Sequence, residues 1–142
     1  MIAIDTNLLV YAHRSAVPEH ARARRAIESA ADDPHGWGIS IASVAEFWAI
    51  VTHPAAAGRP STPKEAADFL DSLAQEGGMQ IWAPRAGFHG RLLQLAQDLK
   101  VSGARIFDLQ IALTAFENDA YELWTHDAKF VRIPGLRILD PL

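Results

Sequence analysis

The chain has 142 residues, of which 49% are hydrophobic and 21% charged, and this size and composition are typical of one folded domain spanning residues 1–142. The absence of cysteine excludes disulfides and thiolate metal sites and favours a reducing, cytoplasmic location. The net charge of −4 excludes a protein that coats nucleic acid through bulk positive charge. We expect neither a signal peptide nor a membrane span, because the chain shows no basic N-terminal region and no long apolar run.

Strand-like and helix-like patterns alternate along the chain. Short apolar runs predict strands at residues 2–4, 37–41, 79–83, 121–125 and 136–139. Apolar residues at helical spacing, together with start and stop signals, predict helices near residues 8–12, 19–31, 44–52, 63–76, 88–99 and 104–116. This order predicts the α/β class, as a three-layer α/β/α sandwich around a mainly parallel central sheet of about five strands.

Capping residues predict where three of these helices begin. Thr6 or Asn7 is expected to cap the first helix, and Ser43 is expected to cap the third. The fourth helix has a stronger signal, because Thr62 and Glu65 form a capping box with proline at the first helical position. These signals set the helix boundaries that we expect in the fold.

Four acidic residues are conspicuous because of where they lie. Asp5 follows the first buried strand, and Asp127 lies two residues beyond the fourth. Glu46 and Asp108 are each isolated in a long apolar stretch of predicted helix. Ligands of parallel sheets gather beyond the carboxyl ends of the strands, so these acids can converge there. Such a cluster raises its own pKa values or binds a cation, and ligands that are all oxygen select Mg²⁺ or Mn²⁺.

Each acid also has a simpler explanation. A lone acid in an apolar helix is often partly exposed at an edge or paired with an arginine. An Asp after a strand is a common helix N-cap. Only the combination of the four acids therefore points to a site, and their convergence is a hypothesis at this stage.

Taken in order, these motifs resemble a PIN-domain ribonuclease, and specifically the VapC toxin of a bacterial toxin–antitoxin pair. The resemblance rests on Ile4-Asp5-Thr6-Asn7, Ser43-Val44-Ala45-Glu46-Phe47, Asp108-Leu109-Gln110-Ile111-Ala112 and Thr125-His126-Asp127-Ala128-Lys129-Phe130. The stretches Val51-Thr52-His53-Pro54 and Pro60-Ser61-Thr62-Pro63 resemble a mycobacterial-type subgroup. Each motif is short, but their order and spacing cover nearly the whole chain.

The resemblance implies metal-dependent endoribonuclease activity on RNA phosphodiesters. It gives Asp5, Glu46, Asp108 and Asp127 catalytic and metal-binding roles toward Mg²⁺ or Mn²⁺. It also implies a VapB-type antitoxin as a partner, whose basic side chain can enter the acidic site, and a homodimer. The four family acids are all present, so the resemblance implies an active enzyme.

Other polar residues are candidates for supporting roles. Thr6, Asn7 and Thr125 can hydrogen-bond to the carboxylates and orient them, or can be ordinary cap and turn residues. Arg14 and Arg105 are candidates to bind RNA, because the planar guanidinium suits phosphate.

Two alternatives to a nuclease stay open. A phosphatase can also carry an Asp nucleophile after its first strand, but it needs a second Asp where Asn7 stands. A non-catalytic docking module would use the acids only to bind a basic partner, without metal-dependent turnover.

Overall fold

The computed structural model describes all 142 residues. Helices pack on both faces of one five-stranded sheet. The strands are β1 (Ile2–Ile4), β2 (Trp37–Ser40), β3 (Gln80–Trp82), β4 (Glu122–Trp124) and β5 (Arg137–Leu139). Their order in the sheet is β3-β2-β1-β4-β5, and every pairing is parallel. The predicted α/β/α sandwich is confirmed, and β1 lies at the centre of its sheet.

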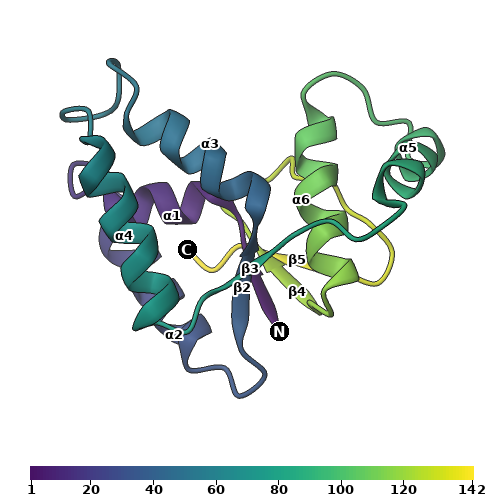
Figure 1. The fold of residues 1–142 in the computed structure, drawn as a ribbon, viewed down its shortest axis with the longest axis horizontal. Coiled ribbons are helices and arrows are strands. Elements are labelled where there is room, and N and C mark those ends of the chain that lie inside the picture. The colour runs from purple at the N-terminus through teal and green to yellow at the C-terminus, as the bar shows by residue number, and fades with distance from the viewer.

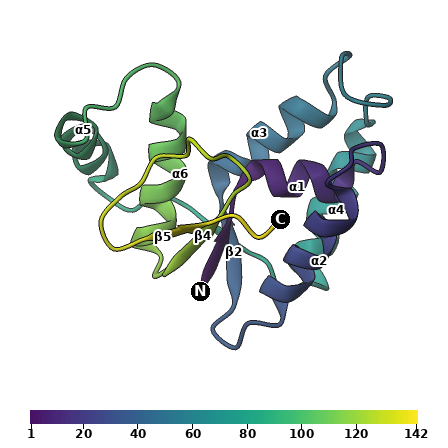
Figure 2. The ribbon, with the colours of Figure 1, turned by 180° about the vertical axis from the view of Figure 1, so that it is seen from behind.

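Six helices make the outer layers, with the two groups visible on opposite sides of the strands in Figures 1 and 2. One face is covered by α1 (Thr6–His13), α2 (His20–Ala31), α3 (Ile41–Val51) and α4 (Pro63–Gln75), and the other by α5 (Phe88–Asp98) and α6 (Arg105–Glu117). None of these helices combines the length and apolar character needed to cross a bilayer.

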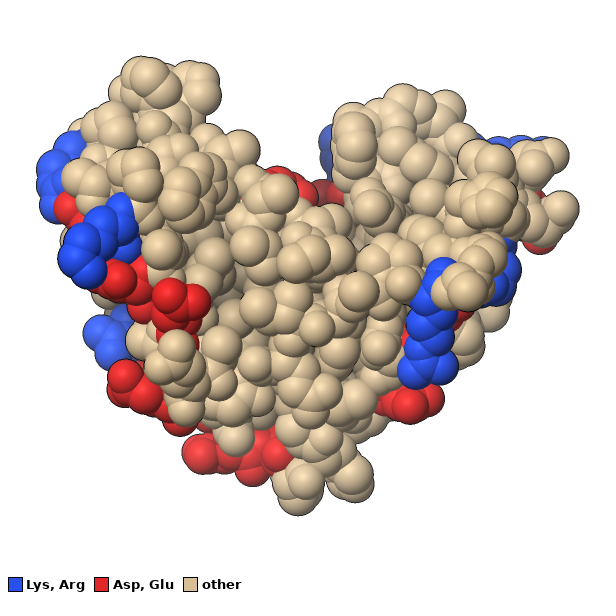
Figure 3. Space-filling view, in the orientation of Figure 1, with Lys and Arg blue, Asp and Glu red and all other residues tan.

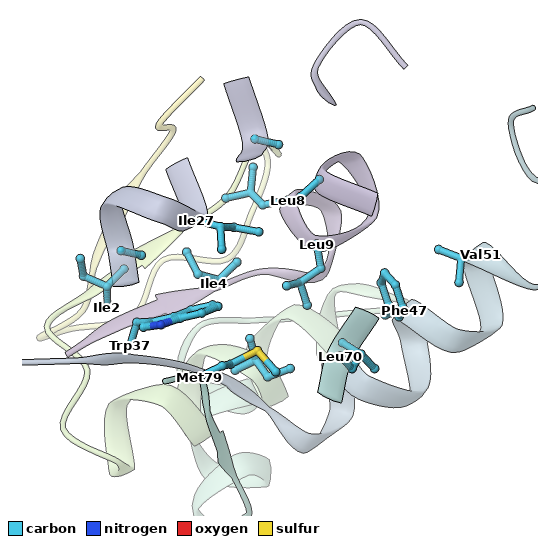
Figure 4. Packing of buried hydrophobic residues seen from close by; sticks show 14 of the residues in the cluster. Ile2, Ile4, Leu8, Leu9, Ile27, Trp37, Phe47, Val51, Leu70 and Met79 are labelled. Carbon is cyan, nitrogen blue, oxygen red and sulfur yellow. The ribbon is translucent and has the colours of Figure 1, made fainter. Parts of the chain in front are cut away.

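The core on the α1–α4 face is built around Trp37 of β2. Its ring lies with Ile4 and Met79 between the strands and the covering helices (Figure 4). Its indole Nε1 donates a hydrogen bond of 2.7 Å to the carbonyl of Gly77, just after α4. Trp37 therefore fills the core and also fixes the chain that leads from α4 into β3.

The core on the other face depends on small residues of α6. Ala112 and Ala115 are 0% and 1% exposed, in one apolar cluster with Ala3 and Leu123 of the central strands. Small side chains let the helix axis approach the sheet closely. Leu109, which follows Asp108 on α6, is 0% exposed in the same cluster, so this part of the helix is also held in the core.

Two of the three predicted caps are wrong, and for the same reason. Asp5 caps α1 by accepting from the backbone N–H of Thr6 at 2.7 Å, and Ser40 caps α3 by accepting from Ala42 at 3.2 Å. In both places the strand runs straight into the helix, so the last extended residue is the cap, rather than Thr6, Asn7 or Ser43.

The third cap follows its sequence signal. Thr62 Oγ1 accepts a hydrogen bond of 3.2 Å from the backbone N–H of Glu65, and Pro63 is the first residue of α4. Here a loop precedes the helix, so the capping box is the local start signal and the prediction is confirmed.

Gly38 in β2 gives a test of how tightly the sheet packs. An added Cβ would lie 2.6 Å from the carbonyl oxygen of Gln80 and 2.7 Å from the Trp82 ring. We expect Gly38→Ala to lower the free energy of unfolding by about 1–3 kcal/mol through overpacking, as measured by urea denaturation. Gly90→Ala on α5 is the matched control, because nothing lies within 4 Å of its Cβ position. Equal free energies of unfolding for the two variants would contradict this close packing around Gly38.

Candidate active site

Asp5 lies at the carboxyl end of the central strand and is 6% exposed. Its two oxygens have different partners. Oδ1 accepts from the backbone N–H of Thr6 at 2.7 Å. Oδ2 accepts from Thr125 Oγ1 at 2.7 Å and from Asn7 Nδ2 at 3.0 Å. Three donors and no cation therefore surround a buried carboxylate, which fixes its orientation without neutralising its charge.

Thr125 is the centre of this hydrogen-bond network. Its Oγ1 accepts from Asn7 Nδ2 at 2.9 Å and from the backbone N–H of Asp127 at 3.1 Å. Both acceptor positions of the hydroxyl are thus used, so its single proton must go to Asp5. Asn7 closes the network by accepting from the backbone N–H of His126 at 3.3 Å. The predicted orienting roles of Thr125 and Asn7 match these contacts.

The environment of Asp5 raises its pKa to about 6. Burial is the main cause, because removing a carboxylate from water disfavours its charged form. The hydrogen bonds from Thr125 and from the backbone of Thr6 act in the opposite direction. The charges of Glu46 and Asp108 raise the pKa further, which places both carboxylates within electrostatic reach of Asp5.

Glu46 of α3 and Asp108 of α6 line opposite walls of one cleft of ≈ 640 Å³. Its other walls are mostly apolar and include Phe107, which is 61% exposed. Figure 3 shows acidic atoms at the bottom of the notch between the two lobes of the molecule, in the orientation in which Figure 1 shows α3 and α6 on either side. The cleft therefore gives solvent access to the acids.

The pKa values of the two cleft acids are also raised, and burial is the first cause for each. The charge of Asp108 raises the pKa of Glu46, and the charge of Asp127 raises that of Asp108. Arg105, one helical turn before Asp108, lowers the pKa of Asp108 but forms no ion pair with it. The four acids thus influence one another, and none has a basic partner in the chain.

Thr6 lies beneath the cleft and faces Glu46. Its hydroxyl is fully buried and has no hydrogen-bond partner within normal distance, although it is near enough to lower the pKa of Glu46. A buried hydroxyl is rarely left without a partner, and the Glu46 carboxylate is the polar group within its reach. Thr6 was predicted to orient a carboxylate, and only its backbone N–H does so for Asp5.

Asp127 lies in the exposed loop after β4. Its Oδ1 accepts from the backbone N–H of Lys129 at 2.8 Å, so the loop holds the carboxylate in a turn. Its own N–H donates to Thr125, which ties this loop to the network at Asp5. Asp127 and Glu46 are the two exposed members of the four acids, whereas Asp5 is buried.

The four acids offer only oxygen donors, which are the ligands that a hard cation prefers. No three His, Asp or Glu side chains lie close enough together to form a ready-made metal site. Mg²⁺ is usually held by one or two carboxylates, with waters and substrate phosphates completing its octahedron. Unpaired carboxylates that surround an open cleft, with all-oxygen donors, fit that mode of binding and do not fit a closed structural site.

The structure gives Arg14, a predicted RNA-binding residue, a structural role instead. Arg14 is 8% exposed, and its guanidinium donates to the backbone carbonyls of Val51 and Arg59. Those bonds anchor the loop between α3 and α4, so the group is not available to phosphate. Arg105, the other candidate, is exposed and makes no side-chain hydrogen bond or ion pair.

The structure adds residues that the sequence did not single out. His126 Nδ1 lies 2.8 Å from Asp140 Oδ2, and its ring meets Tyr11 edge-on. Burial raises the pKa of the Tyr11 phenol most, and the charges of Glu19, Asp127 and Asp5 raise it further, in that order. The sequence did not indicate these contacts, because the three residues come from α1, the loop after β4 and the C-terminal segment.

A model of the PIN domain family matches residues 2–136. The chain belongs to the PIN domain family. Within that family it belongs with the VapC ribonucleases, since it is 33% identical over 142 residues to VapC ribonuclease Mb2897 of Mycobacterium bovis. That alignment covers 100% of this chain and 96% of the relative.

Solved structures give the same picture of the PIN fold. The sarcin-ricin loop cleaving toxin VapC20 of Mycobacterium tuberculosis aligns with a TM-score of 0.68 at 13% identity, covering 92% of each chain, which shows the fold alone. VapBC2 of Rickettsia felis, bound to a DNA fragment from its promoter, aligns with a TM-score of 0.63 at 25% identity over 99% of this chain and 98% of that chain.

Thr125→Val tests the hydrogen-bond network of this PIN domain. Valine keeps the shape but removes the donor to Asp5, so we expect the pKa of Asp5 to rise above about 6, as followed by carboxyl NMR titration. We also expect a stability loss of about 1–3 kcal/mol, because polar groups are left unpaired. Thr114→Val is the control, since that buried hydroxyl bonds only to the carbonyl of Gln110 in its own helix. An unchanged Asp5 titration would contradict the network.

Proposed function

We propose that this PIN domain, residues 1–142, is a Mg²⁺- or Mn²⁺-dependent endoribonuclease that acts as the toxin of a VapBC pair in the cytoplasm. One observation supports the proposal most directly. Asp5, Glu46, Asp108 and Asp127 form no ion pair, although seven other acid–base pairs exist in the chain. Unpaired carboxylates at the end of a sheet and around a cleft are costly for stability, and an external cation offsets that cost.

We assign each residue of the site a separate role in hydrolysis. Asp5 and Asp108 would hold the cation, and Glu46 and Asp127 would bind it directly or through water. When bound, the cation supplies an activated water and neutralises charge that develops on the phosphate. One of the carboxylates accepts the proton that the attacking water releases. Thr125 and Asn7 keep Oδ2 of Asp5 in a fixed direction throughout.

The cleft itself suits an antitoxin segment. Glu46 and Asp108 offer negative charge, and Ala42, Phe107 and Ile111 offer apolar contact. A peptide that carries apolar residues and one basic side chain matches both, and its cation would compete with the metal ion for the acids. VapBC2 of Rickettsia felis, a similar structure, is a toxin–antitoxin complex by its name.

A homodimer is the second assembly that we propose. Helix α3 exposes three large apolar side chains, Ile41, Trp48 and Ile50, at 45%, 39% and 42%, and the first two share a face of the helix. Neighbouring exposed apolar residues of this size favour contact with another protein surface, and a second copy of the chain is the simplest partner.

RNA cleavage is the direct test of the proposed activity. The purified protein is incubated with mixed RNA in Mg²⁺ or Mn²⁺ and, separately, in EDTA. We expect cleavage only with the metal, and a loss of at least about a hundredfold in Asp5→Asn and Asp108→Asn, because each removes a charged ligand. Arg85→Ala, an exposed residue outside the cleft, is expected to cleave like the wild type. Equal cleavage by the Asn variants would contradict the assigned site.

The pH dependence of folding stability tests the proposed metal-binding acids without a measurement of catalysis. The folded protein holds a proton on Asp5 up to about pH 6, whereas the unfolded chain loses it near 3.8. The folded state therefore binds more protons in this window, and this group's contribution to stability falls as pH rises from about 4 to 6. The raised pKa values of Glu46 and Asp108 act in the same direction.

We expect thermal unfolding of the metal-free protein to show this fall and Asp5→Asn to show less of it. At neutral pH, Mg²⁺ or Mn²⁺ is expected to raise the melting temperature by binding the native carboxylates. The same ions should have little effect on Asp108→Asn. A melting temperature that does not respond to either ion would count against a metal site, whatever the cleavage assay shows.

A further inference from the structure

A second concave surface lies beside the acids and is basic. This groove, of ≈ 510 Å³, is formed by the segment between α5 and α6 and by the loop that follows Asp127. Its lining residues are Leu99, Val101, Arg105, Ala128, Lys129, Phe130, Val131 and Arg132. Three of them are cationic, and none is acidic. In a chain with a net charge of −4, such a local excess of positive charge calls for an explanation.

The three cations of the basic groove are free. Arg105, Lys129 and Arg132 are exposed, and their side chains form no ion pair or hydrogen bond in the structure. The loop that carries two of them is nevertheless anchored, because Phe130 and Val131 are only 4% and 2% exposed. The groove therefore presents exposed, unpaired cations on an anchored backbone, as expected for a surface that binds an anion.

The basic groove adjoins the acids on two sides. Arg105 is one turn before Asp108 on α6 and is close enough to lower its pKa. Lys129 is two residues after Asp127, whose carboxylate accepts the backbone N–H of Lys129. An elongated anion that crosses the acids with the help of a metal ion therefore runs directly into the groove.

We propose that the basic groove binds the sugar–phosphate backbone of the RNA next to the cleaved bond, with Lys129 and Arg132 as phosphate contacts beside Arg105. The proposal rests on the nuclease function above and adds to it a second contact region. Guanidinium and ammonium groups bind phosphate oxygens well. Leu99 and Val101 form an apolar side of the groove against which a ribose or base can pack.

RNA suits this groove better than an acidic peptide does. A peptide rich in Asp or Glu would meet the carboxylates of Asp108 and Asp127 at the end of the groove, where like charges repel. A phosphodiester strand meets the same acids through the divalent cation, which binds carboxylate and phosphate oxygens together. The change from basic to acidic surface thus fits an RNA strand that is bound by the groove and cleaved at the neighbouring acids.

Salt-dependent RNA binding tests the groove without turnover. A labelled single-stranded RNA of mixed sequence is titrated in Mg²⁺ with the Asp5→Asn protein, so that the strand stays intact. We expect Lys129→Ala and Arg132→Ala each to weaken binding about five- to tenfold, as for one charge-assisted contact. Each should also reduce the slope of log K against log salt by about 0.7, the value for one phosphate of a single strand.

Arg85→Ala, made in the same background, is the matched control. It also removes an exposed arginine without an ion pair, but from the segment before α5. It should keep both the affinity and the salt slope. Unfolding curves of all variants should coincide with that of the parent, since the changed side chains make no contacts that hold the fold.

Two results would overturn the groove as an RNA site. One is equal affinity and equal salt slope for the groove variants and the control. The other is a glutamate-rich peptide that displaces the RNA at the same concentration as unlabelled RNA does, which would assign the groove to a protein partner. Weakened binding in the groove variants together with a wild type that cleaves no RNA in any metal would support the groove and contradict the proposed activity instead.

Discussion

The hydrogen bond from Thr125 to Asp5 joins the ends of two neighbouring strands that are 120 residues apart in the chain. The other oxygen of Asp5 caps α1, so the same carboxylate fixes a helix start on one side and a strand end on the other. The fold and the site therefore share one side chain. A substitution at Asp5 changes the charge of the site and the cap of α1 together, which is why Thr125 is the more selective position for studying the network.

The network stabilises an arrangement that would otherwise be unfavourable. A buried carboxylate without a cationic partner is costly, and hydrogen bonds offset only part of that cost, as the raised pKa of Asp5 indicates. Glu46 and Asp108 add like charge across the cleft. The rest of the molecule compensates through its two apolar cores, one on each face of the sheet. The stability of those cores allows the end of the sheet to keep unpaired charge for function.

The sequence was a good guide where local pattern determines structure. Alternating strands and helices predicted the parallel sheet, and the capping box at Thr62 marked α4. The sequence was a poor guide where distant segments decide the outcome. Arg14 is buried and donates to the carbonyls of Val51 and Arg59, which lie 37 and 45 residues later in the chain. No sequence pattern around Arg14 indicates these contacts. The orienting role of Thr125 was predicted as one of two options, and its three hydrogen bonds, one of them to Asp5, favour that role.

Arg105 shows how the two charged regions depend on each other. It stands three residues before Asp108 on one helix, a spacing at which an arginine and an aspartate can form an ion pair. Such a pair would neutralise Asp108 and would also remove a cation from the basic groove. In the structure the two side chains do not pair, and Arg105 lines the groove while Asp108 lines the cleft. One turn of α6 therefore separates the acidic cleft from the basic groove. Because Arg105 and Asp108 do not form an ion pair, neither side chain neutralises the other.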